Sequence, residues 1–209
     1  MRALRKRPRA SYFYRVCIST DRRGNEVDRN HIDLIPEIRL AEAAKTGSKE
    51  AFCELYGNYK DKLYRYALYR LGDPSDAEDA VSECVLAAWQ GISRLRNPEA
   101  FGAWIFRILH NCCVKRIRES AGLRQNMQRI YDNGPAEVSG SLQDASHPSV
   151  SVEIREALSQ LTDEERAVVL LSVLGGLTSR EISEITSLTP GAVRSKLSRS
   201  LAKMREYLS

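Results

Sequence analysis

The sequence has few of the features that mark a secreted, disulfide-bonded or membrane-spanning protein. Its five cysteines, Cys17, Cys53, Cys84, Cys112 and Cys113, are odd in number and irregularly spaced, which does not fit a disulfide framework. No apolar run approaches the roughly 20 residues that a membrane-spanning helix needs, and the basic N-terminus lacks the hydrophobic core of a secretory signal. These absences predict a cytoplasmic protein that does not insert into a membrane.

Sequence features of an enzyme are also scarce, since no Gly-rich phosphate loop and no paired carboxylate site is visible. His110, Cys112 and Cys113 could suggest a nucleophile or a metal site. Adjacent residues on a helix point about 100° apart, so this group cannot converge on one tetrahedral metal, and no fourth ligand follows at helical spacing. We therefore predict packed cysteines, with no catalytic residue, no metal and no cofactor.

The charge is modest in sum but uneven along the chain. The net charge is +5, and the 209 residues suffice for one large domain or two small ones. Residues 1–30 hold nine Arg or Lys against three acids, and residues 94–129 hold eight against two. Local basic surfaces on a nearly balanced chain indicate a polyanion as partner.

Apolar residues recur at helical spacing in two stretches, which predicts an all-α protein with two small helical domains. Residues 120–150 lose this periodicity and are rich in Gly, Pro and Ser, as in a flexible linker. The expected organisation is a basic, poorly ordered extension (1–35), a helical domain (36–120), a linker (121–150) and a second helical domain (151–209). Within the extension, residues 11–20 could instead form a short strand or part of a basic arm that touches nucleic acid.

Several helix starts follow from capping residues. Ser48 is expected to cap one helix, and Asn97 with Pro98 opens another that runs from Glu99 to about Ser120. Capping boxes are expected where Ser or Thr precedes Glu by three residues, namely Ser75 with Glu78, Thr162 with Glu165, and Thr178 with Glu181.

The last stretch, 178–208, predicts a helix-turn-helix. A short helix after Thr178 is followed by a tight turn, and Thr189 then caps a second helix with Pro190 at its first position. The second helix has an apolar stripe and a polar, basic face, which is the pattern of a recognition helix. The stripe is Val193, Leu197, Leu201, Met204 and Leu208. The other face is Ser195, Lys196, Arg199 and Lys203, with Arg194 at its border.

Two more helices carry charge of opposite sign. Asp76, Glu78, Asp79 and Glu83 form an acidic face, which suits a basic protein partner or plain solvation. The helix after Asn97 is basic and contains aromatic residues, which suits single-stranded nucleic acid, although the usual place for Phe101 and Trp104 is the core.

Three motifs in order resemble extracytoplasmic-function sigma factors of the sigma-70 family. Residues 76–83 with Trp89 resemble the helix that binds core RNA polymerase. Phe101, Trp104, Ile105, Ile108 and Asn111, followed by Lys115 and Arg118, resemble the helix that melts the promoter and reads the minus-ten element. Residues 161–166, 176–182 and 191–197 resemble the minus-thirty-five-binding domain. The resemblance covers residues 38–208.

The resemblance implies a role for each face. The fold would be sigma domain 2 and sigma domain 4 joined by a flexible linker, with core RNA polymerase, promoter DNA and an anti-sigma factor as partners. The polymerase-binding residues would be Asp76, Glu78, Asp79 and Glu83. The minus-ten residues would be Arg94, Arg96, Trp104, Arg107, Asn111, Lys115 and Arg118, with one flipped base read near Asn111. The minus-thirty-five residues would be Arg194, Ser195, Lys196, Arg199 and Lys203.

The sequence departs from the family pattern at two places. Cys112 and Cys113 follow Asn111 where the family often has a polar residue, and residues 1–35 have no counterpart in the minimal family form. Two other hypotheses remain at this point: a helix-turn-helix regulator that binds duplex DNA without polymerase, and a helical adaptor that binds no DNA.

Overall fold

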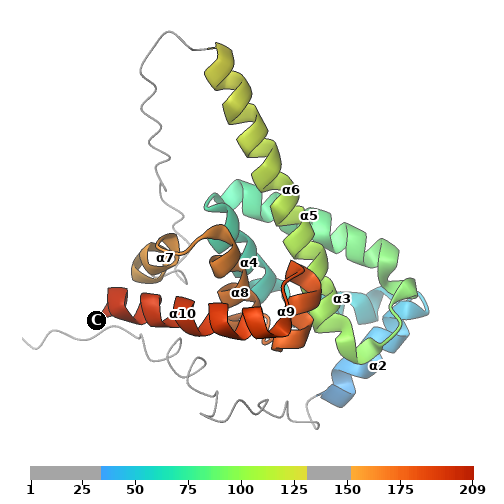
Figure 1. The fold of residues 1–209 in the computed structure, drawn as a ribbon. Helices are drawn as coiled ribbons and strands as arrows, with labels where there is room; N and C mark the ends of the chain where they lie inside the picture. The colour runs from blue at the N-terminus through green and yellow to red at the C-terminus, as the bar shows by residue number, and fades with distance from the viewer. Residues whose placement is uncertain (1–33, 131–151) are drawn as a thin grey trace, which may run out of the picture.

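The computed structural model describes residues 34–130 and 152–209, and within these ranges the regular structure is entirely helical (Figure 1). The all-α prediction is therefore confirmed. The first unit contains α2 (Leu34–Lys45), α3 (Lys49–Gly57), α4 (Lys60–Leu71), α5 (Pro74–Gly91), the short 3-10 helices η1 (Ile92–Arg94) and η2 (Pro98–Ala100), and α6 (Phe101–Ile130). The second contains α7 (Val152–Ser159), α8 (Asp163–Val173), α9 (Ser179–Thr186) and α10 (Pro190–Leu208). Residues 1–33 of the predicted extension (1–35) lie outside the described residues, and its last two residues belong to α2.

Most predicted caps are present. Ser48 accepts the N–H of Ala51, and Thr189 accepts that of Ala192 ahead of Pro190. Both predicted capping boxes of the second unit are complete, at Thr162 and at Thr178. Each such cap stabilises a helix by about 1 kcal/mol, so local hydrogen bonds fix where these helices begin.

The start of α5 differs from the prediction, because Ser75 is not its cap. The Asp73 carboxylate accepts the backbone N–H of Asp76 at 2.9 Å, and Pro74 takes the first helical position. Gly72, with φ of +81°, ends α4 immediately before. Pro favours the first helical position because its fixed φ suits the helix and its missing N–H is not needed there, so the cap falls on the residue before Pro74.

Helix α6 continues to Ile130, past the predicted end near Ser120. Leu123, Met127 and Ile130 extend the helical spacing of apolar residues in the sequence. A single glycine inside a helix costs about 1 kcal/mol, and Gly122 therefore does not end it. The first third of the predicted linker belongs to this helix, and residues 131–151 lie outside the described part.

The core of the first unit lies where α4, α5 and α6 meet. Alanines on α5, among them Ala77, Ala80 and Ala88, are fully buried, and small side chains let neighbouring helices approach closely. Tyr66 and Phe106 fill the space opposite with their rings edge to face at 5.7 Å. The result is a rigid support for the exposed faces of α5 and α6.

The second unit, which was predicted as a helical domain, packs α8, α9 and α7 against α10. Val193 and Met204 of the predicted stripe are buried, Leu197 and Leu201 are partly buried, and Leu208 is 42% exposed at the helix end. The stripe prediction is thus confirmed except at its last residue.

The two units touch each other. Helix α8 packs on α4, and α9 packs on α6 (Figure 1). The sequence patterns gave no indication of this contact.

Candidate nucleic-acid and protein interfaces

The predicted helix-turn-helix is formed by α9, a short turn and α10. Ser187 takes the left-handed conformation (φ 61°) that ends α9, and the Ser183 hydroxyl donates to the Leu188 carbonyl at 2.6 Å across the turn. Ile182 and Ile185 are buried beneath α10. The angle between the two helices is therefore held by packing and by a hydrogen bond within the turn.

The five predicted DNA-contacting residues of α10 divide into two groups. Arg194, Ser195 and Arg199 are exposed, and the Arg199 Nε donates to the Ser195 carbonyl at 3.3 Å. Lys196 pairs with Glu164 at 2.7 Å, and Lys203 lies 3.7 Å from Glu165. The lysines thus connect α10 to the start of α8, whereas the two arginines and Ser195 are exposed to solvent.

Helix α6 presents a row of exposed polar side chains. Arg107, Asn111, Lys115 and Arg118 are all exposed and recur every three or four residues, so they share one face of the helix. Arg94, the last residue of η1, and Arg96, on the segment that joins η1 to η2, are exposed just before this helix. The three cations of α6 therefore form a basic surface with one amide, that of Asn111, among them.

Trp104 is only partly buried and is not a free stacking platform. Its ring lies 5.8 Å from that of Phe101, and a Cβ built on Gly91 would be 3.4 Å from its Cζ2 atom. Phe101 itself is buried. Phe101 is therefore a core residue, as the sequence allowed. Trp104 is a partly exposed apolar residue beside the basic surface.

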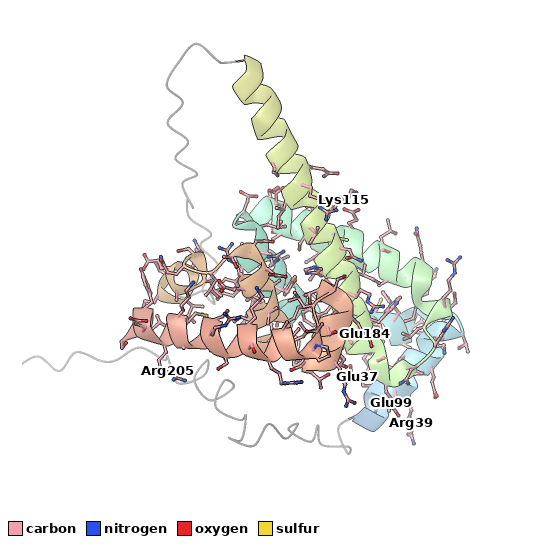
Figure 2. The ribbon with its side chains drawn as sticks, in the orientation of Figure 1. Glu37, Arg39, Glu99, Lys115, Glu184 and Arg205 are labelled. Carbon is pink, nitrogen blue, oxygen red and sulfur yellow. The ribbon has the colours of Figure 1, made fainter. Side chains whose placement is uncertain are left out.

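The acidic face of α5 adjoins the basic face of α6, which the sequence did not predict. Lys115, which is labelled on α6 in Figure 2, pairs with Glu83 at 2.8 Å. Arg116 lies 3.4 Å from both Asp76 and Asp79. The hydrogen bond and charge of Glu83 raise the pKa of Lys115. The two predicted surfaces are thus linked through ion pairs, and Glu78 is an exposed acid on the same helix.

The group of His110, Cys112 and Cys113 is buried, as the packed-cysteine prediction required. The Tyr66 hydroxyl lies 2.8 Å from Nδ1 of His110. Burial lowers the pKa of His110 to about 4 and raises the pKa of Cys113 to about 12, so the imidazole is neutral and the thiol protonated at neutral pH. A protonated, buried thiol is a poor nucleophile. Across residues 34–130 and 152–209, no group of three His, Cys, Asp or Glu is placed to hold a metal ion.

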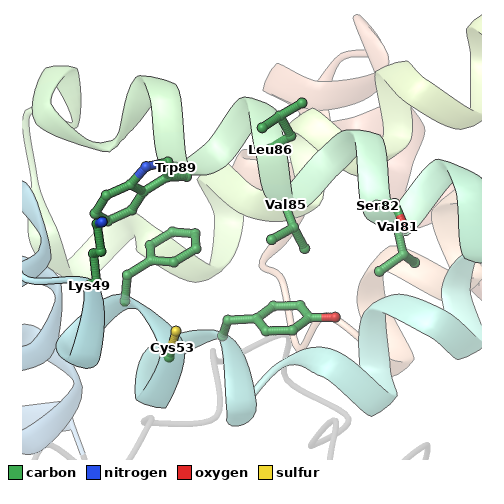
Figure 3. A pocket seen from close by; sticks show the side chains of 9 residues that line it. Lys49, Cys53, Val81, Ser82, Val85, Leu86 and Trp89 are labelled. Carbon is green, nitrogen blue, oxygen red and sulfur yellow. The ribbon is translucent and has the colours of Figure 1, made fainter.

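An apolar groove between α3 and α5 was missed by the sequence patterns (Figure 3). Its volume is about 520 Å³, and Leu86 stands 59% exposed on its α5 side. The lining residues are Lys49, Phe52, Cys53, Tyr56, Val81, Ser82, Val85, Leu86 and Trp89. The sequence feature that could have indicated this groove is Leu86. It is an apolar residue that shares a helix face with Asp79 and Glu83, at spacings of seven and three.

Of the helices in the described ranges, none combines the length and the apolar character needed to cross a bilayer.

Comparison with known proteins assigns the two units separately. The family model described as Sigma-70 region 2 matches residues 55–122, and the model described as Sigma-70, region 4 matches residues 151–204. The chain is 28% identical to the ECF RNA polymerase sigma factor SigW of Bacillus subtilis, over 78% of this chain and 92% of that one. It is 31% identical to the ECF RNA polymerase sigma factor SigL of Mycobacterium tuberculosis, over 72% of this chain and 85% of that one.

The fold is also found among solved structures. The sigma factor RpoE of Bartonella quintana, solved in complex with the anti-sigma factor NepR, matches with a TM-score of 0.61 at 23% identity, over 77% of this chain and 98% of that one. Two helical units that match the two sigma regions in order, with relatives over most of their length, show that the chain belongs to the extracytoplasmic-function group of the sigma-70 family.

Proposed function

We propose that this protein binds core RNA polymerase and directs it to promoters by reading a minus-thirty-five and a minus-ten element. The observation that carries the proposal is the pair of exposed, mainly basic faces, one on α10 in the second unit and one on α6 in the first. The second unit reads duplex DNA, and the first unit holds the opened strand. The protein would act in the cytoplasm. RNA synthesis itself belongs to the polymerase.

The α10 helix would enter the major groove at the minus-thirty-five element. Arg194 and Arg199 are both exposed on α10, and each guanidinium can donate two hydrogen bonds to a guanine edge. A good bidentate contact of this kind discriminates by about 1–3 kcal/mol. Lys196 and Lys203, which pair with Glu164 and Glu165, would lie nearer the phosphates.

The α6 helix would hold the non-template strand at the minus-ten element. The cations for the phosphates come from Arg107, Lys115 and Arg118. Arg94 and Arg96, which precede α6 in the chain, add two more. Asn111 lies between them with an amide that can pair with a base edge, and Trp104 borders the same face. Extruding one base costs a few kcal/mol, which contacts around Asn111 would have to recover.

The α5 helix would bind the polymerase through mixed contacts. The negative charge comes from Asp76, Glu78, Asp79 and Glu83. The groove beside Leu86 provides an apolar surface on which a side chain of the polymerase could pack. An exposed leucine beside a groove of this size is typical of a protein-binding surface. An anti-sigma factor that competes with the polymerase is proposed as a further partner, because the fold relative RpoE was solved with one.

In vitro transcription with purified core polymerase tests the proposal against the alternative of a polymerase-independent regulator. We expect the chain to produce transcripts with a defined start from a promoter that core polymerase alone does not use. A regulator of the alternative kind would bind the duplex unaided and only block or boost transcription by another holoenzyme. Absence of co-purification with core polymerase would overturn the proposal.

A further inference from the structure

The groove between α3 and α5 has an apolar lining and negatively charged surroundings. Phe52 of α3 and Trp89 of α5 meet edge to face with their ring centroids 5.2 Å apart. Val85 of α5 lies on one side of the groove and Cys53 of α3 on the other (Figure 3). The two helices together carry six acidic residues and one basic residue. The groove therefore suits an occupant that is both apolar and positively charged.

The chain itself contains a segment of that chemistry. Residues 1–20 lie outside the described part, but their sequence has six basic residues and no acidic one. Five of these bases lie in residues 1–9, the basic run. Residues 11–18, the aromatic run, follow with Tyr12, Phe13, Tyr14, Val16 and Ile18. Aromatic side chains bury about 150–250 Å² each in an interface, so the aromatic run suits the lining and the basic run suits the acids.

The groove is within reach of this segment. Fifteen residues separate Ile18 from Leu34, where α2 begins, and α2 packs on α3. A chain of this length spans up to about 50 Å, whereas a domain of about 100 residues has a radius of gyration near 13 Å. Because the segment is tethered, its effective concentration at the groove can reach the order of millimolar. Weak contacts are then enough to keep the groove occupied in most molecules.

We propose that the aromatic run binds in the groove between α3 and α5 of the same chain, with the basic run along the acidic face of α5. The apolar contacts come from Tyr12, Phe13 and Tyr14. The segment then competes with the polymerase for α5. This competition rests on the proposed function, whereas the binding of the segment within the chain does not.

Alkylation of cysteines measures whether the groove is occupied. Cys53 lines the groove and is exposed, whereas Cys84, Cys112 and Cys113 are buried. Iodoacetamide treatment of the full chain, followed by peptide mass spectrometry, gives the rate at Cys53 separately from the rate at Cys17. The three buried cysteines should stay unmodified in every variant that is folded.

Two variants are compared with the wild type. The triple variant, Tyr12→Ser with Phe13→Ser and Tyr14→Ser, removes the proposed apolar contacts. The control, Val152→Ser with Tyr207→Ser, removes two exposed apolar side chains of the second unit. If the segment occupies the groove in about four molecules of five, only a fifth of the chains present a free groove, and removing the segment raises any reaction there about fivefold.

We therefore expect Cys53 to be alkylated about fivefold faster in the triple variant than in the wild type, and the control to match the wild type. Equal rates in the triple variant and the wild type overturn the proposal. Equal rates together with weaker binding of a single-stranded oligonucleotide would instead assign the segment to nucleic acid. A wild-type rate that rises on dilution would mean that a second copy supplies the segment, which also overturns binding within one chain.

A synthetic peptide provides a second measurement. The peptide has the sequence of residues 1–20 with Cys17→Ser, so that it does not consume the reagent. Added to the triple variant at millimolar concentration, it should slow the alkylation of Cys53 again. The same peptide with the three additional Ser substitutions is the control. Protection by neither peptide overturns the binding, and protection by both overturns the role of the aromatic run.

The affinity for core polymerase tests the competition separately. The triple variant should bind core polymerase about fivefold more tightly than the wild type, for the same reason of a freed groove. Faster alkylation without tighter binding supports the binding of the segment within the chain but overturns the competition. It would also exclude the groove from the proposed polymerase interface, so failure of the proposal and failure of the proposed function are distinguishable.

Discussion

Neighbouring residues of α6 divide stability and function between them. His110 and Asn111 are neighbours, yet His110 is buried against Tyr66 while Asn111 faces solvent. One side chain therefore affects the stability of the first unit, and the other is free to contact a base. Substitutions at the two positions should have separable effects.

The titration of His110 predicts a pH dependence of stability. Its pKa in the folded chain is about 4, mainly because burial disfavours the charged ring, whereas an unfolded histidine titrates near 6.5. The unfolded state therefore binds more protons between these values. The stabilisation is fully present above pH 6.5 and is lost as the pH falls toward 4, by about 3 kcal/mol.

Urea unfolding of the wild type and of His110→Gln at pH 7 and pH 4.5 measures this dependence. We expect the wild type to lose more of its free energy of unfolding between these pH values than the variant does. Identical losses would mean that His110 is not the residue responsible.

Asn111 predicts a defect in promoter opening. Asn111→Ala removes an exposed amide from the middle of the basic surface without disturbing the core. We expect about a tenfold loss of open complex, as for one lost hydrogen bond to a base, measured by permanganate reactivity of the melted strand. Binding to core polymerase should be unchanged, and an equal loss of both would refute the assignment of α6.

At the scale of elements, each surface is supported by one buried helix face. The apolar stripe of α10 fixes which residues point outward, and the lysines of that helix are engaged by α8. The alanine face of α5 brings it close to α6, which is why Asp76 and Asp79 meet Arg116. Packing thus decides which charges are available to a partner.

For α10, the division between its arginines and its lysines predicts unequal effects. Arg194→Ala and Arg199→Ala should each reduce transcription from a promoter with an intact minus-thirty-five element by about tenfold, because each would remove a proposed base contact of about 1–3 kcal/mol. Arg205→Ala, near the exposed end of the same helix, is the matched control. Equal effects of all three would indicate a general loss of charge.

For α5, the groove predicts that an apolar residue contributes to polymerase binding. Leu86→Ser should weaken co-purification with core polymerase about tenfold while leaving the melting temperature unchanged, since the side chain is 59% exposed. Leu208→Ser, at a residue 42% exposed in the second unit, is the control. Unchanged binding of Leu86→Ser would exclude the groove from the interface.

At the scale of the whole molecule, acidic and basic side chains of the proposed interfaces form ion pairs with each other within the chain. Glu83 neutralises Lys115 within the first unit, and Glu184 neutralises Arg107 between the units. Such pairing lowers the affinity of the free chain for nucleic acid, because fewer cations remain to displace counterions from phosphates.

The sequence alone determined the helices, most of their caps and the exposed face of α10. Capping by Thr162, Thr178 and Thr189 depends on atoms three residues apart, and the α10 stripe depends on helical spacing. Such local features can be read from neighbouring residues. The misplaced cap at Ser75 arose within the same local range, because two candidate caps flank Pro74.

Only the tertiary structure decided which of those faces are free. The pairing of Arg116 with Asp76 joins residues 40 positions apart, and that of Arg70 with Asp163 joins residues 93 apart. No periodicity links such positions, because they meet only when separate helices pack. The burial of Arg70, the groove beside Leu86 and the contact between the units therefore follow from the three-dimensional arrangement of the helices.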